Sequence, residues 1–168
     1  MRRAMRGQWV SFLLAAVVAA AASASAVAYD GDVMSGHVSG TFDVKMATEK
    51  LDGTAVAPSL GRMSIAKTFH GPLDATSVGA MLSSGNPASG TVAYVALETV
   101  TGTLDGRAGS FVLVHSASMN AGQQNLSITV APGSGSGALS GLTGTMGIRI
   151  EGGKHYYDFD YTLPEKGP

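Results

Sequence analysis

From Thr41 onward the sequence alternates apolar and polar residues with a period of two, the pattern of β-strands that bury one face. In the first such run Phe42, Val44 and Met46 share the apolar face. No amphipathic helix of useful length follows residue 28. The pattern predicts eight strands, one starting at Thr41 and the others at Arg62–His70, Leu73–Ser83, Thr91–Leu104, Gly109–Met119, Asn125–Ala131, Thr143–Ile150 and Lys154–Leu163.

Short turn signals separate most of these strands: Gly71-Pro72, Gly85-Asn86-Pro87, Asp105-Gly106 and Gly152-Gly153. The longer Gly/Ser run 132–137 predicts a mobile loop, because too few residues follow it for a second domain.

Sequential strands with short links predict an all-β fold, an eight-stranded antiparallel up-and-down barrel, since closure removes exposed sheet edges. A two-sheet sandwich is the alternative. A barrel of this size is either filled by side chains or holds one small ligand.

The amino terminus carries a basic stretch, an uncharged run from Val10 to Ala22, and then small residues up to Ala28. This order predicts a signal peptide over residues 1–28, cleaved within Ala24 to Tyr29, and a single β-barrel domain over residues 29–168. An uncleaved anchor is the alternative, but the run is short and rich in alanine. We therefore expect a secreted or periplasmic protein with no stable membrane span after cleavage.

Charge and cysteine content exclude several classes of function. Removing Arg2, Arg3 and Arg6 leaves a net charge of about −4, and no basic stripe with interleaved aromatic residues is present, so nucleic acid is not an expected partner. The absence of cysteine excludes disulfides, thiol nucleophiles and thiolate metal sites. The oligomeric state is left open.

The segment from Tyr94 to Met119 predicts a long hairpin around residues 105–108. With the turn centred between Gly106 and Arg107, Glu98 faces His115 directly across the ladder, surrounded by apolar and aromatic neighbours. In the last hairpin a turn at Gly152-Gly153 places four pairs on an apolar face: Ile150 with His155, Ile148 with Tyr157, Met146 with Phe159 and Gly144 with Tyr161.

Alternation along Arg62–His70 aims Lys67 at the same interior as Glu98 and His115. An unpaired charge in an apolar interior is energetically costly, so we expect these three groups to interact with one another or with water. They form either a structural network or a ligand site, unless the register is wrong and they are exposed. In the ligand interpretation Glu98 or His115 is a general base and Lys67 a cationic anchor, and the ligand-binding candidates are Lys67, Tyr94, Glu98, His115, Tyr157 and Tyr161.

Other patterns carry little chemistry. His70 lacks the spacing of a metal ligand, and Asp158 with Asp160 fits a solvated strand face, so no metal is expected. No phosphate-binding glycine loop, nucleophile elbow or dinucleotide fingerprint is present, so no cofactor is expected.

Four blocks carry a resemblance to a known family: residues 40–44 (GTFDV), 67–71 (KTFHG), 106–113 (GRAGSFVL) with His115, and 154–159 (KHYYDF). With them the chain resembles a bacterial family of unknown function whose barrel is similar to that of allene oxide cyclase. The resemblance to the cyclase implies the fold only, because no active-site motif of that enzyme can be placed on this sequence.

Three functions fit these observations. The first is an exported barrel that binds a small apolar or amphipathic molecule, with Lys67, Glu98 and His115 fixing its polar end. The second is a cofactor-free isomerase or cyclase with Glu98 as base. The third is a filled barrel that serves only as a structural or interaction module.

Overall fold

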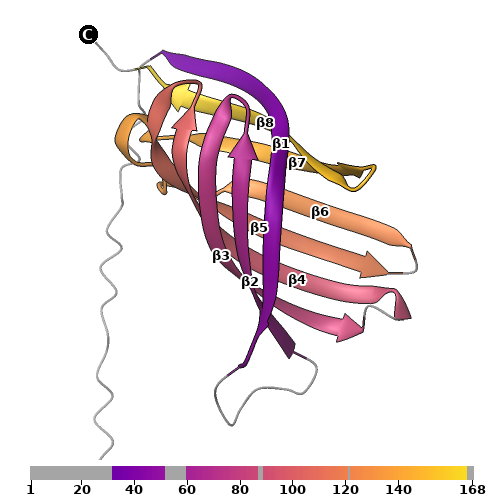
Figure 1. Ribbon diagram of the computed structural model, residues 1–168. Coiled ribbons are helices and arrows are strands. Elements are labelled where there is room, and N and C mark those ends of the chain that lie inside the picture. Colours follow the sequence, from indigo (N-terminus) through magenta and orange to yellow (C-terminus); the bar gives the residue numbers. More distant parts are fainter. Residues whose placement is uncertain (1–31, 52–59, 87–88, 121, 166–168) are drawn as a thin grey trace, which may run out of the picture. The chain divides into compact units, whose positions relative to one another are not determined.

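The computed structural model describes residues 32–51, 60–86, 89–120 and 122–165, so the expected signal peptide and its cleavage positions lie outside the described residues. The described chain forms a closed antiparallel barrel in which each strand pairs with the next and β8 returns to β1 (Figure 1). Its strands are β1 (Val33–Glu49), β2 (Leu60–His70), β3 (Leu73–Asn86), β4 (Thr91–Leu104), β5 (Arg107–Asn120), β6 (Gln123–Val130), β7 (Thr143–Glu151) and β8 (Lys154–Pro164). The all-β barrel predicted from the alternation is therefore confirmed. Within the described ranges, no helix has the length and apolar character needed to cross a membrane.

One end of the barrel, here called the closed end, is packed with aromatic and aliphatic side chains. The rings of Phe111 and Phe159 stack with their centroids 5.7 Å apart, and Phe69 meets Tyr157 edge to face. A short 3-10 helix, η2 (Gly137–Leu139), lies in the β6–β7 connection. Leu139 and Leu142 of this connection are almost fully buried, so they complete the apolar filling.

Two tyrosines of β8 fit beside glycines of β1. Gly36 pairs with Tyr161 and Gly40 with Tyr157, and a Cβ atom on either glycine would overlap the ring opposite. The Tyr157 hydroxyl donates to the His70 carbonyl at 3.3 Å and accepts the Leu73 amide at 3.2 Å. Tyr157 therefore bridges the ends of β2 and β3 across their turn.

The β6–β7 connection follows the edge of β5 beyond the point where β6 ends. The Ala131 amide donates to the Val112 carbonyl and the Ser136 amide to the Ser110 carbonyl, each at 2.8 Å, while the Ser134 hydroxyl accepts the Val112 amide. The segment that the Gly/Ser run predicted as a mobile loop is thus held along β5 by backbone hydrogen bonds.

The register of the β4–β5 hairpin differs from the predicted one by two residues. Leu104 pairs with Arg107, so the turn consists of Asp105 and Gly106 alone, and both have positive φ angles of 48° and 74°. This is the geometry of a two-residue type I′ turn, which matches the twist of the strands. Glu98 consequently pairs with Leu113, and the predicted direct opposition of Glu98 and His115 is wrong. The last hairpin has the predicted register, with Ile150 opposite His155.

β6 and β7 are joined far less than other neighbouring strands. Their one recorded pairing in the described chain is Thr129 with Thr145, whereas β6 pairs with β5 along its whole length. Below, this region is called the seam. The seam runs from the closed end, where the two strands meet, to the opposite or open end of the barrel.

Candidate ligand-binding site

The interior of the open end holds a cavity of about 510 Å³, within the range of small-molecule sites. It reaches both edges of the seam, because Leu126 of β6 and Ile148 of β7 lie in its wall. Its lining is mostly aliphatic and aromatic, with a few polar groups: Phe42, Val44, Met46, Ile65, Lys67, Met81, Tyr94, His115, Gln124, Leu126, Ile148, Ile150 and His155.

A buried polar cluster borders this cavity. The Lys67 ammonium donates to Glu98 Oε2 at 2.7 Å, and the Ser77 hydroxyl donates to Glu98 Oε1. His115 Nε2 lies 2.9 Å from Glu98 Oε2, although its geometry is not that of a regular hydrogen bond. The Glu98 side chain is fully buried, and both its oxygens have protein partners.

The strand register explains how these side chains meet. Gly79 of β3 pairs with Glu98 of β4, and the missing side chain of Gly79 leaves room beside the Glu98 backbone. Lys67 pairs with Ser77 one step further along the sheet. Glu98 therefore reaches Ser77 and His115 diagonally, as long side chains do between adjacent strands, and Lys67 extends to it across β3.

Glu98 is ionised across the physiological range. Burial raises the pKa of its carboxyl group, but the contact with His115, the charge and hydrogen bond of Lys67 and the Ser77 hydroxyl together outweigh burial. The pKa accordingly falls from 4.5 to about 2. The cluster thus holds a carboxylate that is neutralised locally by the Lys67 ammonium.

The Lys67 ammonium is also held by two aromatic rings. Its nitrogen lies 5.1 Å from the centroid of Phe42 and 5.6 Å from that of Phe69. Cation–π attraction of this kind is strongest for desolvated cations. Lys67 is thus fixed by one carboxylate and two rings, while His115 Nε2 remains without a well-formed hydrogen bond among the described residues.

The structure separates the six predicted candidates into two groups. Lys67, Tyr94 and His115 line the cavity, and Glu98 lies against Lys67 and His115. Tyr94 is partly buried, and burial raises the pKa of its hydroxyl.

The other two candidates, Tyr157 and Tyr161, belong to the closed end. The Tyr157 hydroxyl is engaged by the β2–β3 turn, and the Tyr161 hydroxyl donates to Asp105 Oδ2 at 2.5 Å. Burial, then the contact with Asp105, raises the pKa of Tyr161 to about 12. Neither ring lies in the cavity wall.

Several residues of the site were missed by sequence reasoning. Ser77 could have been found, because it shares the inward parity of Leu73 and Ala75 on β3. Gln124 and His155 also have inward parity, and the last hairpin predicts His155 on the apolar face, but their place in the cavity wall depends on how far each strand extends along the barrel. No group of three or more potential metal-ligating side chains occurs in the part of the chain that the structure describes.

Comparison with known proteins gives one family. The profile of a family described as "Protein of unknown function (DUF3224)" matches residues 38–161. A crystal structure of a DUF3224-family protein with unknown function from Shewanella oneidensis MR-1 is similar, at 45% identity and a TM-score of 0.71, and the match covers 79% of this chain and 100% of that one. A comparison with curated proteins finds no match.

Proposed function

The chain belongs to the DUF3224 family of proteins of unknown function, and we propose that it binds a small amphipathic molecule in the open end of its barrel. The observation that carries this proposal is a cavity of about 510 Å³ bordered by a buried, charge-balanced cluster. Binding sites of this size typically combine an apolar lining with a few convergent polar groups.

The lining favours a ligand with an apolar body. Val44, Met46, Ile65, Met81 and Ile148 form much of the wall, and burial of alkyl surface against them supplies the main driving force. The cavity volume lies within the range of small-molecule pockets, so a chain of about ten carbons is a suitable probe.

The polar groups favour a single hydrogen-bonding end on that ligand. Lys67 and His115 both lie in the cavity wall, and the Lys67 ammonium has three donors, of which Glu98 Oε2 takes one. A carboxylate or hydroxyl placed here would gain hydrogen bonds that water otherwise provides. Because Glu98 already neutralises Lys67, the site does not require a ligand with a full negative charge.

Glu98 is poorly suited to the role of general base in an isomerase or cyclase. A base works best when its pKa lies near the working pH, whereas the pKa of Glu98 is about 2 and both its oxygens have partners. We therefore propose binding rather than catalysis for this cluster.

Mass spectrometry of the purified protein under native conditions tests the proposal. We expect a co-purified small molecule, or stoichiometric binding of decanoic acid or decanol added as probes. Ile148→Trp, which fills the cavity from β7, should lose binding, whereas Ser35→Trp on the exposed outer side of β1 is the matched control and should retain it. A protein that binds neither probe, or an Ile148→Trp variant that binds both normally, would contradict the proposal.

We also propose that the protein is exported, with cleavage within Ala24 to Tyr29. Sequencing the amino terminus of the protein recovered outside the cytoplasm checks this, and retention of Met1 would contradict it.

A further inference from the structure

The outer face of β3, β4 and β5 exposes large aliphatic side chains side by side. Val78 is 68% exposed, Leu97 60%, Val95 56% and Leu82 45%. The register places Leu82 opposite Val95 and Leu97 opposite Val114, so these side chains form adjoining rows and not isolated points. A contiguous apolar patch of this kind marks an interaction site more often than a free surface.

This face also carries no charge. Every outward position of β4 and β5, and of β3 from Thr76 to Ser84, is aliphatic, Ser, Thr or Asn. The outer face of β8, β1 and β2 is different, with ion pairs between His37 and Asp160 at 2.7 Å and between His70 and Asp43 at 3.0 Å. The barrel thus has one charged side and one uncharged side.

We propose that the outer face of β3, β4 and β5 binds a second copy of this chain, forming a two-fold symmetric dimer. In a two-fold interface each patch meets itself, so a charged patch would repel its copy while an uncharged one does not. The rows of exposed aliphatic side chains also fit a homodimer, because homodimer interfaces are more apolar than other protein interfaces.

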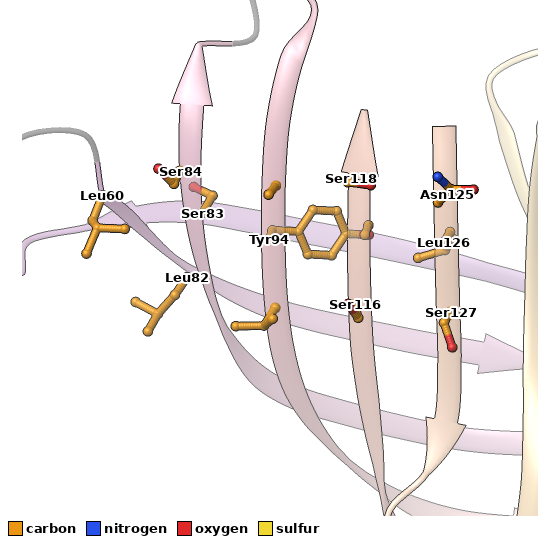
Figure 2. Close-up of a pocket in the computed structure, with 13 residues that line it drawn as sticks. Leu60, Leu82, Ser83, Ser84, Tyr94, Ser116, Ser118, Asn125, Leu126 and Ser127 are labelled. Carbon is orange, nitrogen blue, oxygen red and sulfur yellow. The ribbon is translucent and has the colours of Figure 1, made fainter. Parts of the chain in front are cut away.

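The shape of the face supports self-association. A hollow of about 600 Å³ lies over Ala80 and is bordered by Leu82, Val95 and Leu97, with Arg62 of β2 at its edge, where Arg62 pairs with Glu49 at 3.0 Å. A second hollow, of about 780 Å³, extends toward the strand ends, between Leu60 and Leu82 on one side and Ser116, Asn125 and Ser127 on the other (Figure 2). Projecting leucines beside hollows on one face provide both halves of a self-complementary contact.

The size of the face agrees with a dimer. Strands lie about 4.8 Å apart, and outward residues lie about 7 Å apart along each strand. The face of β3, β4 and β5, together with the flanking parts of β2 and β6 that carry Leu60, Arg62, Asn125 and Ser127, therefore spans roughly 25 Å on a side. Such a face approaches the roughly 800 Å² that each partner buries in a standard interface.

Sedimentation equilibrium of the purified protein over a range of concentrations tests the proposal. We expect a dimer for the native sequence. Leu97→Asp should raise its dissociation constant by about 30-fold or more, because a charge would be buried at the centre of the interface. Ser35→Asp places the same charge on the exposed outer side of β1 and should leave the dimer intact.

Circular dichroism of Leu97→Asp distinguishes dissociation from unfolding, because Leu97 points outward and its replacement should leave the barrel folded. A native protein that stays monomeric at about 100 µM, well above the dissociation constants of stable dimers, would overturn the proposal. A Leu97→Asp variant that dimerises normally would also overturn it. Binding of the monomer to phosphatidylcholine vesicles would instead assign the face to a lipid surface.

Discussion

The two ends of the barrel interior are built from the same strands but are filled differently. At the closed end, Phe69, Phe111 and Phe159 pack with Leu139 and Leu142, and each is at most 1% exposed. At the open end, shorter or more exposed side chains such as Met46 and Ile148 leave a cavity. The difference shows that one alternating pattern can specify both a solid core and a binding site, depending on side-chain volume and strand pairing at each level.

The buried cluster of Lys67, Glu98, Ser77 and His115 marks the boundary between these two ends. Phe42 and Phe69 contact Lys67 from the core, while the cavity reaches Lys67 and His115 from the other side. The cluster therefore lies where the aromatic packing gives way to the cavity, and Phe42 contacts both.

The closed end should be the most sensitive to loss of volume. Phe159→Ala removes a fully buried ring that stacks on Phe111, and we expect the free energy of unfolding to fall by about 3–5 kcal/mol. Urea denaturation of the variant and the native protein measures this difference. A change below about 1 kcal/mol would show that the closed end is loosely packed.

The buried cluster should be nearly as sensitive to substitution, because it depends on paired charges rather than on side-chain volume. Glu98→Gln leaves the Lys67 ammonium buried without a counter-charge, which should lower the free energy of unfolding by about 3 kcal/mol. The double variant Glu98→Gln with Lys67→Met removes both charges, so it should lose less than the sum of the two single variants. Additive losses in this double-mutant cycle would mean that the two groups do not interact.

Lowering the pH should destabilise the buried cluster around Glu98 before it affects the closed end. The pKa of Glu98 is about 2 in the folded protein and near 4.5 without its partners, so its stabilisation is complete above about pH 4.5 and is lost as the pH falls toward 2. The expected loss is on the order of 3 kcal/mol over this range. Denaturant midpoints at several pH values measure it, and Glu98→Gln should have a flatter profile than the native protein.

The open end should tolerate the loss of volume best. Met46→Ala shortens a side chain that is 47% exposed and lines the cavity, so the free energy of unfolding should change by less than about 1 kcal/mol. The affinity for decanoic acid should nevertheless fall, because apolar contact is lost. Equal losses of stability for Met46→Ala and Phe159→Ala in the same urea experiment would remove the distinction between the two ends.

Side-chain direction could be predicted from the sequence, because it depends only on whether a position is odd or even along its strand. Lys67, Glu98 and His115 were therefore placed on one interior face, and they do meet. The error of two residues in the β4–β5 register left this result unchanged, since a shift of two preserves the face. It changed only the pairing, from direct to diagonal.

The height of a side chain, meaning its position along the barrel axis, could not be predicted in the same way. Tyr157 and Tyr161 point inward as their parity requires, but they lie at the closed end, where the β2–β3 turn and Asp105 engage their hydroxyls. This height depends on the stagger accumulated across all the strands, which no single hairpin specifies. The cavity was equally beyond prediction, because it depends on the summed volumes of side chains from many strands.

The seam has a consequence for amide hydrogen exchange. β3 pairs with β4 at every residue from Leu73 to Asn86, whereas β6 and β7 are joined at Thr129 and Thr145. Amides on the facing edges of β6 and β7 consequently lack the ladder hydrogen bonds that slow exchange with solvent. A molecule bound between Leu126 and Ile148 would shield these edges from solvent. Ligand binding should therefore slow amide exchange along β6 and β7.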